Sequence, residues 1–254
     1  MQKIYVTIVS HYNDDDIISN SNLKGVNALE NVTVIIRDNV SSNRLEEFCG
    51  DGGFQYSASK SKLGFGANNN RNFDEASKLG MTQDDWFVLI NPDVDITSDM
   101  INKLSVIIDN NDNHIFAINL FSDDKFSKME YSLRKYPNFL SFFNVLKGKS
   151  FTEAYKKDGV ADRSEVDWAA GSFLVFKAGL YERLNGFDEN YFMYFEDVDI
   201  CYRANKIFGE KVVYLKDVHA VHKGGYRNRR LFSPHFRWYI SSLIRFLFKR
   251  CSRV

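Results

Sequence analysis

Residues 86–95 read Trp-Phe-Val-Leu-Ile-Asn-Pro-Asp-Val-Asp, and this stretch decides the fold class. Five bulky apolar residues in a row are typical of a buried strand, and Pro92 cannot donate a hydrogen bond to a sheet, so the strand should end there. In an α/β sheet, ligands bind at the carboxyl ends of the strands. Asp93 and Asp95 would lie at that edge, where their oxygen atoms suit Mg²⁺ or Mn²⁺ with a substrate diphosphate. The alternative is an ordinary polar loop after a strand.

Strand-like and helix-like segments alternate along the rest of the chain. The expected strands are residues 4–10, 32–37, 54–57, 86–90 and 115–120, and the expected helices include residues 68–79 and 98–109. This order predicts an α/β fold with a mostly parallel sheet flanked by helices and joined by right-handed connections. Between residues 121 and 164 the periodicity weakens. That stretch is either a poorly ordered insert or a surface for a second substrate.

Length, cysteines and charge narrow the class of protein. The 254 residues suit one large domain that needs neither disulfides nor a structural metal. The three cysteines form no CxxC spacing, and no signal-like segment precedes the first strand, so we expect a cytoplasmic protein. Lys plus Arg equals Asp plus Glu at 33 each. Because no nucleic-acid-binding motif accompanies this neutral balance, we expect no nucleic-acid partner.

The C-terminal segment differs from the rest of the chain. No window of 18 apolar residues is present, so no span of a bilayer is expected. Residues 232–248 read as a helix whose apolar stripe consists of Phe236, Tyr239, Ile240, Leu243, Ile244 and Leu247, opposite a polar face of Arg237, Ser241, Arg245 and Lys249. This helix either lies in a membrane interface or docks on the main domain. We therefore divide the chain into a main domain of residues 1–230 and a basic amphipathic segment of residues 231–254.

Two further segments suit the binding of a nucleotide or a phosphate. Residues 37–39 read Arg-Asp-Asn after the second expected strand, and the Asp38 carboxylate can accept hydrogen bonds from a pyrimidine N3–H or a ribose hydroxyl. A turn aspartate is the common alternative. Residues 64–71 read Gly-Phe-Gly-Ala-Asn-Asn-Asn-Arg, so backbone N–H groups at a helix N-terminus can face a phosphate or sugar. This run is neither a Walker loop nor a dinucleotide-binding fingerprint.

An acidic pair and two histidines complete the candidate residues. Glu196 and Asp197 follow an aromatic run at the start of an expected helix, where a partly dry pocket would suit one of them as a general base. Acids favoured by the helix dipole are the alternative. His219 and His222 follow a strand-like segment. A lone histidine is usually structural, but one at a loop edge can bind metal.

These segments, in their order along the chain, resemble the bacterial family 2 glycosyltransferases of the GT-A fold, and most of all the rhamnosyltransferases that build O-antigen and related polysaccharides. The resemblance covers about residues 3–240. Each motif is weak alone, and their joint order and spacing carry the similarity. The matching segments are residues 7–10, 37–39, 64–70, 91–93, 168–172, 186–188, 196–199 and 221–222.

The resemblance implies a donor side at the first strands. Ser10 and Asp38 would line the nucleotide pocket, with Asp38 near the base. Gly64 and Asn69 would border the donor. Asn91 stands where the family's DxD motif has its first Asp and would also belong to the donor site, which therefore carries less charge than a full DxD motif.

The resemblance also implies a metal and a base. Asp93 would bind Mg²⁺ or Mn²⁺, with His222 as a further contact to the metal or the diphosphate. Asp197 occupies the place of the catalytic base, and Glu196 would orient it or the acceptor. Asp95 lies outside the usual motif position.

The implied substrates are a nucleotide sugar and a lipid-linked saccharide. The resemblance favours dTDP-rhamnose as donor and a polyprenyl-diphosphate-linked acceptor, with Trp168 and Gly171 facing the acceptor sugar. Work on such an acceptor would hold the protein peripherally on the inner face of the cytoplasmic membrane through its C-terminus. The alternatives are a galactofuranosyl or other hexosyl transferase, a nucleotidyltransferase, and a non-catalytic sugar-nucleotide-binding module.

Overall fold

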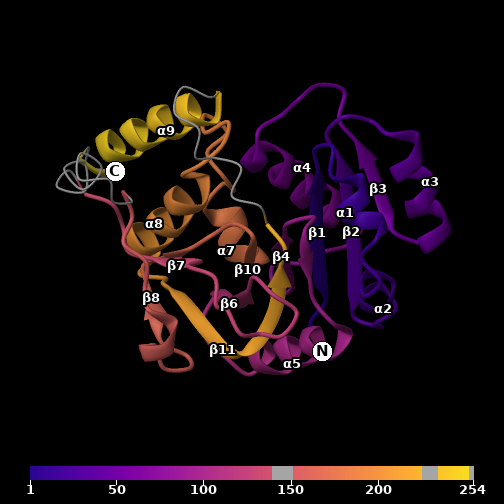
Figure 1. The fold of residues 1–254 in the computed structure, drawn as a ribbon, viewed down its shortest axis with the longest axis horizontal. Coiled ribbons are helices and arrows are strands. Elements are labelled where there is room, and N and C mark those ends of the chain that lie inside the picture. The colour runs from indigo at the N-terminus through magenta and orange to yellow at the C-terminus, as the bar shows by residue number, and fades with distance from the viewer. Residues whose placement is uncertain (139–150, 225–233, 252–254) are drawn as a thin grey trace.

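A nine-stranded sheet forms the centre of the protein in a computed structural model, which describes residues 1–138, 151–224 and 234–251. The strand order is β3-β2-β1-β4-β10-β6-β11-β5, and β8 pairs with β11 outside this path (Figure 1). The strands are β1 (Ile4–Ser10), β2 (Val32–Asp38), β3 (Gln55–Ala58), β4 (Trp86–Ile90), β5 (Val94–Asp95), β6 (Ile115–Phe121), β8 (Glu165–Val166), β10 (Phe173–Lys177) and β11 (Val212–His222). A separate two-stranded sheet pairs β7 (Leu133–Arg134) with β9 (Trp168–Ala169).

The predicted α/β fold with a largely parallel sheet is confirmed. Strands β3, β2, β1 and β4 are all parallel, and β6 is parallel to β11. One strand that the sequence did not predict, β10, lies antiparallel between β4 and β6. The short β5 is antiparallel to the end of β11. The sheet is therefore mixed on the side that carries the metal-binding candidates.

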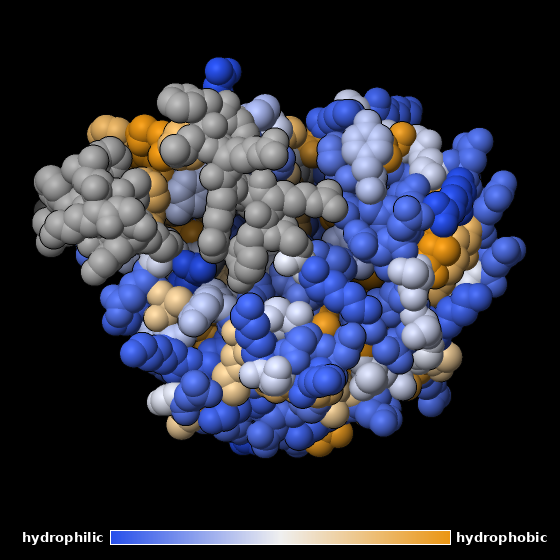
Figure 2. All heavy atoms as spheres, viewed as in Figure 1, coloured by the Kyte–Doolittle hydropathy of each residue, from blue (hydrophilic) through white to orange (hydrophobic). Residues whose placement is uncertain are grey.

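Helices cover both faces of the sheet, and the surface in the view of Figure 1 is mostly hydrophilic (Figure 2). One face packs against α1 (Asp14–Ile18), α2 (Leu23–Asn27), α3 (Asn43–Gly52) and α5 (Ser98–Asp109). The other face packs against α4 (Phe65–Lys78), α7 (Ala178–Arg183), α8 (Glu196–Phe208) and α9 (Pro234–Cys251). A short 3-10 helix, η1 (Lys157–Gly159), lies in the stretch with weak periodicity.

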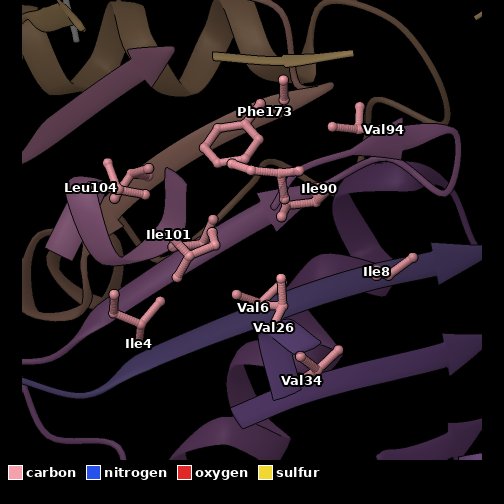
Figure 3. Packing of buried hydrophobic residues seen from close by; sticks show 14 of the residues in the cluster. Ile4, Val6, Ile8, Val26, Val34, Ile90, Val94, Ile101, Leu104 and Phe173 are labelled. Atoms are coloured by element: carbon pink, nitrogen blue, oxygen red, sulfur yellow. The ribbon is translucent and has the colours of Figure 1, made fainter. Parts of the chain in front are cut away.

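Alternation along the strands divides the buried apolar side chains into two clusters. Ile4, Val6 and Ile8 of β1 belong to the cluster that includes the α2 and α5 residues (Figure 3), whereas Tyr5 belongs to the opposite cluster. Successive strand residues point to opposite faces, so a strand buried on both sides reads as a continuous apolar run. This explains why β1 and β4 are recognisable from sequence alone.

The helix starts follow local capping chemistry. Helix α5 begins where predicted, since the Thr97 hydroxyl accepts a hydrogen bond from the Met100 N–H at 3.3 Å. Helix α4 begins at Phe65, three residues before the predicted start, because Gly64 is extended (φ −70°, ψ 170°) and acts as its N-cap. The amides of residues 68–70 consequently lie inside the helix rather than at its first residues, where the predicted start at residue 68 would put them.

Helix α9 packs on the domain through one side and leaves a second apolar strip outside. Ser242, Leu243, Phe246 and Leu247 are buried, whereas Ile244 is 44% exposed. The predicted single apolar stripe is therefore wrong in part, because its members divide between the core and the surface. Figure 2 shows a hydrophobic patch over α9. No helix in the described ranges is both long and apolar enough to cross a membrane. The predicted boundary at residue 230 and the predicted helix start at residue 232 lie outside the described residues.

Candidate active site

A tight turn follows β4 at the carboxyl edge of the sheet. The Asn91 N–H donates to the Ser172 carbonyl at 3.0 Å, and the Asn91 carbonyl accepts from the Val94 N–H at 3.0 Å. The chain turns here because Pro92 ends the strand. The hydrogen bond to Ser172 joins this turn to the loop before β10, so two segments that are distant in sequence meet at one edge.

The pairing of β5 with β11 brings Asp93 and His222 together. His222 lies opposite Val94 in this pairing, and the Lys223 N–H donates to the Asp93 carbonyl at 2.9 Å. The His222 Nε2 atom is 3.2 Å from Asp93 Oδ1. A Cβ atom at Gly224 would lie 2.8 Å from the same nitrogen, so the chain passes close to the imidazole there. The structure thus joins the two residues predicted as metal ligands.

A second carboxylate holds the other nitrogen of the same ring. The His222 Nδ1 atom is 2.9 Å from Glu130 Oε2, and the histidine and glutamate side chains are each 13% exposed. Burial of the imidazole opposes its charged form, but hydrogen bonds and charges from Asp93 and Glu130 outweigh this and raise the pKa of His222 to about 9. In the absence of a cation, an imidazolium lies between the two carboxylates. Sequence reasoning missed Glu130, because it lies in the stretch with weak periodicity.

The residues at this edge fit a divalent cation that shares its ligands with a substrate. Across residues 1–138, 151–224 and 234–251, no group of three or more His, Cys, Asp or Glu side chains has the geometry to hold a metal. Asp93 and His222 together offer one carboxylate and one imidazole. Mg²⁺ typically takes one or two protein carboxylates and completes its coordination with water and substrate phosphates. A cation here would therefore need a diphosphate.

The acidic pair begins α8 after a strained turn. Tyr194 and Phe195 both have positive φ angles, 71° and 67°, which non-glycine residues rarely adopt. Such backbone outliers cluster at functional sites. Asp197 accepts hydrogen bonds from the Gly171 N–H at 3.0 Å and the Val198 N–H at 2.8 Å. Glu196 is buried, and its Oε2 atom has no hydrogen-bond partner.

Burial affects the two acids differently. Burial raises the pKa of Glu196 to about 8, and the neighbouring charge of Asp197 adds to the effect. Burial also raises the pKa of Asp197, but the N–H groups of Gly171 and Val198 oppose the change. Hydrogen bonds to a carboxylate favour its charged form. We therefore assign the proton to Glu196 near neutral pH and the negative charge to Asp197, which suits Asp197 as a proton acceptor.

Gly171 allows Asp197 to come close to the loop before β10. A Cβ atom at position 171 would lie 3.1 Å from the Phe65 ring and 3.6 Å from the Asp197 Cβ atom. The same loop carries Ser172, whose carbonyl binds Asn91. The metal-binding candidates and the acidic pair are thus linked through two adjacent residues.

The predicted donor residues are largely occupied by contacts within the protein. Asp38 is fully buried and accepts the N–H groups of residues 40, 41 and 42. The Ser10 hydroxyl donates to Asp14 Oδ1 at 2.8 Å. Asn69 is buried in α4 and donates to the Phe65 carbonyl at 3.0 Å. The contacts of these residues with a donor stay predictions. Ser10 and Asp38 stabilise the loops after β1 and β2 through these hydrogen bonds.

Gly64 and Trp168 also have close protein neighbours. A Cβ atom at Gly64 would lie 2.2 Å from the Phe192 carbonyl oxygen, which accepts the Phe65 N–H at 3.1 Å. Trp168 is buried, and its indole N–H donates to the Lys135 carbonyl at 3.0 Å. Gly64 therefore allows the start of α4 to contact the loop before the acidic pair. The acceptor role of Trp168 stays a prediction.

Comparison with known proteins identifies the family. No family model matches the chain. The rhamnosyltransferase WbbL of Escherichia coli (strain K12) is 34% identical over 251 residues, which cover 97% of this chain and 93% of that protein. The N-acetylglucosaminyl-diphospho-decaprenol L-rhamnosyltransferase of Mycobacterium tuberculosis is 26% identical over 202 residues, or 75% of this chain and 65% of that protein.

The solved structures give the same fold. The mannosyltransferase PcManGT from Pyrobaculum calidifontis, in complex with GDP-Man and Mn²⁺, has a TM-score of 0.60 at 14% identity and covers 99% of this chain and 65% of its own. At this identity the likeness shows the fold alone. The extent of the similarity to WbbL shows the family. This chain belongs to the family 2 glycosyltransferases of the GT-A fold and is a glycosyltransferase similar to rhamnosyltransferases.

Proposed function

We propose that this protein transfers L-rhamnose from dTDP-rhamnose to a saccharide carried on a polyprenyl diphosphate, with inversion at the anomeric carbon, in the synthesis of O-antigen or another cell-surface polysaccharide. The similarity to WbbL supports rhamnose as the sugar. The name of the mycobacterial relative supports an acceptor linked to a polyprenyl diphosphate.

One observation carries the proposal. The hydrogen bond from the Asn91 N–H to the Ser172 carbonyl connects two segments of the chain. One segment carries Asp93, which contacts His222, and the other carries Gly171, whose N–H binds Asp197. An inverting transfer needs charge stabilisation at the leaving diphosphate and a base on the opposite face of the sugar. The first pair suits the diphosphate, and Asp197 suits the acceptor hydroxyl.

The protonation state of the acidic pair determines which residue takes the proton of the acceptor hydroxyl. Asp197 takes the proton of the acceptor hydroxyl as the new glycosidic bond forms and the bond to the donor diphosphate breaks. Glu196, protonated in its buried position, adds no second charge beside Asp197. The Gly171 N–H fixes the direction of the Asp197 carboxylate. When bound between Asp93, His222 and the diphosphate, Mg²⁺ or Mn²⁺ would neutralise the negative charge of the leaving group.

A transfer assay with a panel of donors tests the proposal. The purified protein is given dTDP-rhamnose, UDP-glucose, UDP-galactofuranose or GDP-mannose, together with a synthetic polyprenyl-diphosphate-linked saccharide. We expect transfer from dTDP-rhamnose, dependence on Mg²⁺ or Mn²⁺, and a product whose anomeric configuration is opposite to that of the donor. Transfer only from a UDP-sugar would contradict the rhamnose assignment. Retention of configuration would contradict Asp197 as a simple base.

We further propose that the outer side of α9 contacts an anionic membrane surface. A groove of about 470 Å³ on this side is lined by Phe236, Arg237, Ile240, Ser241 and Ile244. Phe248 is 68% exposed on the same helix. Apolar side chains flanked by basic ones suit the interface of an anionic bilayer, where each basic residue contributes about 1 kcal/mol. The acceptor lipid would then reach the enzyme from this surface.

Surface variants test the membrane contact better than removal of the helix, because α9 also contributes Leu243 and Phe246 to the core. We expect the double variant Ile244→Ser, Phe248→Ser to bind anionic vesicles more weakly and to transfer less to a lipid-linked acceptor, with unchanged transfer to a short soluble acceptor. Val106→Ser on α5, where the side chain is 57% exposed, is the matched control. Equal vesicle binding by all these proteins would exclude α9 as the contact.

A further inference from the structure

Glu130 reaches His222 through a well-defined fold-back of the chain after β6. Asp123 accepts the N–H groups of Ser127 and Lys128, the latter at 2.8 Å, and so closes a turn. Phe121 then pairs with Met129 in an antiparallel bridge, and the Glu130 N–H donates to the Leu120 carbonyl at 2.9 Å. The backbone of Glu130 is therefore fixed against the end of β6, and its carboxylate extends to the imidazole.

The direction of this contact selects a form of the imidazole. In a neutral histidine one ring nitrogen carries the proton and the other carries the lone pair. The Glu130 carboxylate, 2.9 Å from Nδ1, accepts a hydrogen bond and therefore keeps the proton on that nitrogen. When the imidazolium loses its other proton, the lone pair is on Nε2, the nitrogen that lies 3.2 Å from Asp93 Oδ1. Carboxylates that orient metal-binding histidines in this way increase the basicity of the ligand.

We propose that Glu130 is a positioning residue that fixes the His222 tautomer and aims Nε2 at the cation shared with the donor diphosphate. The inference rests on the proposed function, since it requires a cation at Asp93 and His222. Glu130 itself touches neither the cation nor the substrate in this assignment. It acts through the ring of His222.

A buried lysine provides charge near Glu130. Lys157 is 4% exposed, and its Nζ atom donates to the Leu120 carbonyl at 3.3 Å, the same oxygen that accepts the Glu130 N–H. Burial lowers the pKa of Lys157 to about 8, and the Glu130 charge opposes this change. Once a cation replaces the proton on Nε2, the imidazole is neutral. Lys157 then remains as a positive group near the Glu130 carboxylate.

Two substitutions at position 130 separate the hydrogen bond from the charge. Glu130→Gln keeps an oxygen that can accept from Nδ1 but loses the negative charge, whereas Glu130→Leu loses both. The matched control is the pair of His114 and Glu210, whose Nδ1 and Oε1 atoms are 2.7 Å apart at the other end of β6. Glu210→Leu removes an equivalent carboxylate–histidine contact away from the candidate site.

Two measurements distinguish positioning from support of the fold. The first is Mn²⁺ affinity in the presence of dTDP, UDP or GDP, from the electron paramagnetic resonance signal of free Mn²⁺. The second is the ¹⁵N NMR spectrum of metal-free protein above the imidazole pKa, which reports the His222 tautomer. We expect Glu130→Leu to weaken Mn²⁺ binding about 10- to 100-fold and to mix the tautomers. Glu130→Gln should keep the tautomer with a smaller loss, and Glu210→Leu should change neither.

The outcomes separate this inference from the proposed function. Wild-type binding of Mn²⁺ with a nucleotide but without sugar transfer would contradict the proposed function and leave the role of Glu130 supported by the affinities. Unchanged Mn²⁺ affinity and tautomer in folded Glu130→Leu or Glu130→Gln would overturn the inference. It would also be overturned if the wild-type protein bound no Mn²⁺ with any of the three nucleotides.

Discussion

Two carboxylate sites lie at the same edge of the sheet and are stabilised in opposite ways. At the first, one imidazolium between Asp93 and Glu130 offsets part of their negative charge. At the second, Asp197 is held by backbone N–H groups, and the adjacent Glu196 has a buried oxygen without a hydrogen-bond partner. A cation could replace the proton on the imidazolium at the first site, whereas burial favours the protonated form of Glu196 at the second. The contrast supports our proposal that the first site binds a charged ligand and that the second takes up a proton.

The largest effect is expected at the first site. Asp93→Ala should reduce transfer by about 10³-fold or more, because a cation contributes several kcal/mol of charge stabilisation and each 1.36 kcal/mol is a factor of ten. Asp95→Ala is the control. The Asp95 carboxylate accepts a hydrogen bond from Asn22 Nδ2 at 2.8 Å, which indicates a structural role. Initial rates with Mg²⁺ or Mn²⁺, and with a chelator, provide the measurement. Activity of Asp93→Ala that is undiminished, or indifferent to the chelator, would contradict the assignment.

The acidic pair should show a division of roles. Asp197→Asn keeps the shape of the side chain but cannot take the acceptor proton, so kcat should fall about 10²- to 10⁴-fold with donor affinity nearly unchanged. Glu196→Gln resembles the protonated acid that we assign, so it should reduce kcat much less than Asp197→Asn does. Single-turnover rates and donor titrations measure both variants. An equal loss of donor binding in Asp197→Asn would move this residue out of the base role.

The sequence identifies the elements better than the contacts between them. β4 and its end are recognisable because five apolar residues precede Pro92, and α5 because Thr97 caps it. The direction of β10 is not, because an apolar run is the same for either orientation of a buried strand. Hydropathy describes burial locally, whereas strand direction depends on partners elsewhere in the chain.

The candidate site was predicted to a similar extent. The structure places Asp93 beside His222 and Asp197 beside Gly171, whereas the roles of Asp93, His222 and Asp197, which came from motifs at strand ends and from the family resemblance, stay predictions. Glu130 was not found, since neither periodicity nor a motif marks it. The saturated hydrogen bonds of Asp38 were equally hidden, because a turn aspartate and a ligand-binding aspartate read alike. Long-range hydrogen bonds decide between such alternatives, and a single sequence does not contain them.

A smaller effect concerns stability and pH at the second site. An unfolded glutamate has a pKa of about 4.3, whereas burial raises the pKa of folded Glu196 to about 8. Because Glu196 binds more protons in the folded state between these values, its contribution to stability is greatest below the lower value and decreases as the pH rises through this window. Glu196→Gln removes the titration. Its melting temperature should exceed that of wild type by several degrees at about pH 9, and by less at about pH 5.

The matched control for this pH dependence is Glu47→Gln, because Glu47 is an exposed acid on α3. Its melting temperature should follow wild type at both pH values. Thermal unfolding followed by circular dichroism gives the comparison. A difference between Glu196→Gln and wild type that is the same at both pH values would show that Glu196 does not hold a proton in the folded protein.

The smallest effect tests whether α9 supports only the second site. The Ser242 hydroxyl donates to the Met193 carbonyl at 3.0 Å, and Tyr239 packs against the ring of Phe195, so α9 stabilises the strained turn before the acidic pair. Ser242→Ala should cost about 1 kcal/mol of folding free energy, lower the melting temperature by about 2–4 °C and reduce kcat severalfold. Mn²⁺ affinity should not change, because His222 and Asp93 contact other elements. The exposed neighbour provides the control, and Ser241→Ala should leave all three quantities unchanged. If Ser242→Ala instead weakened Mn²⁺ binding as much as it reduced kcat, the two carboxylate sites would be structurally coupled, and their assignment to independent roles would be wrong.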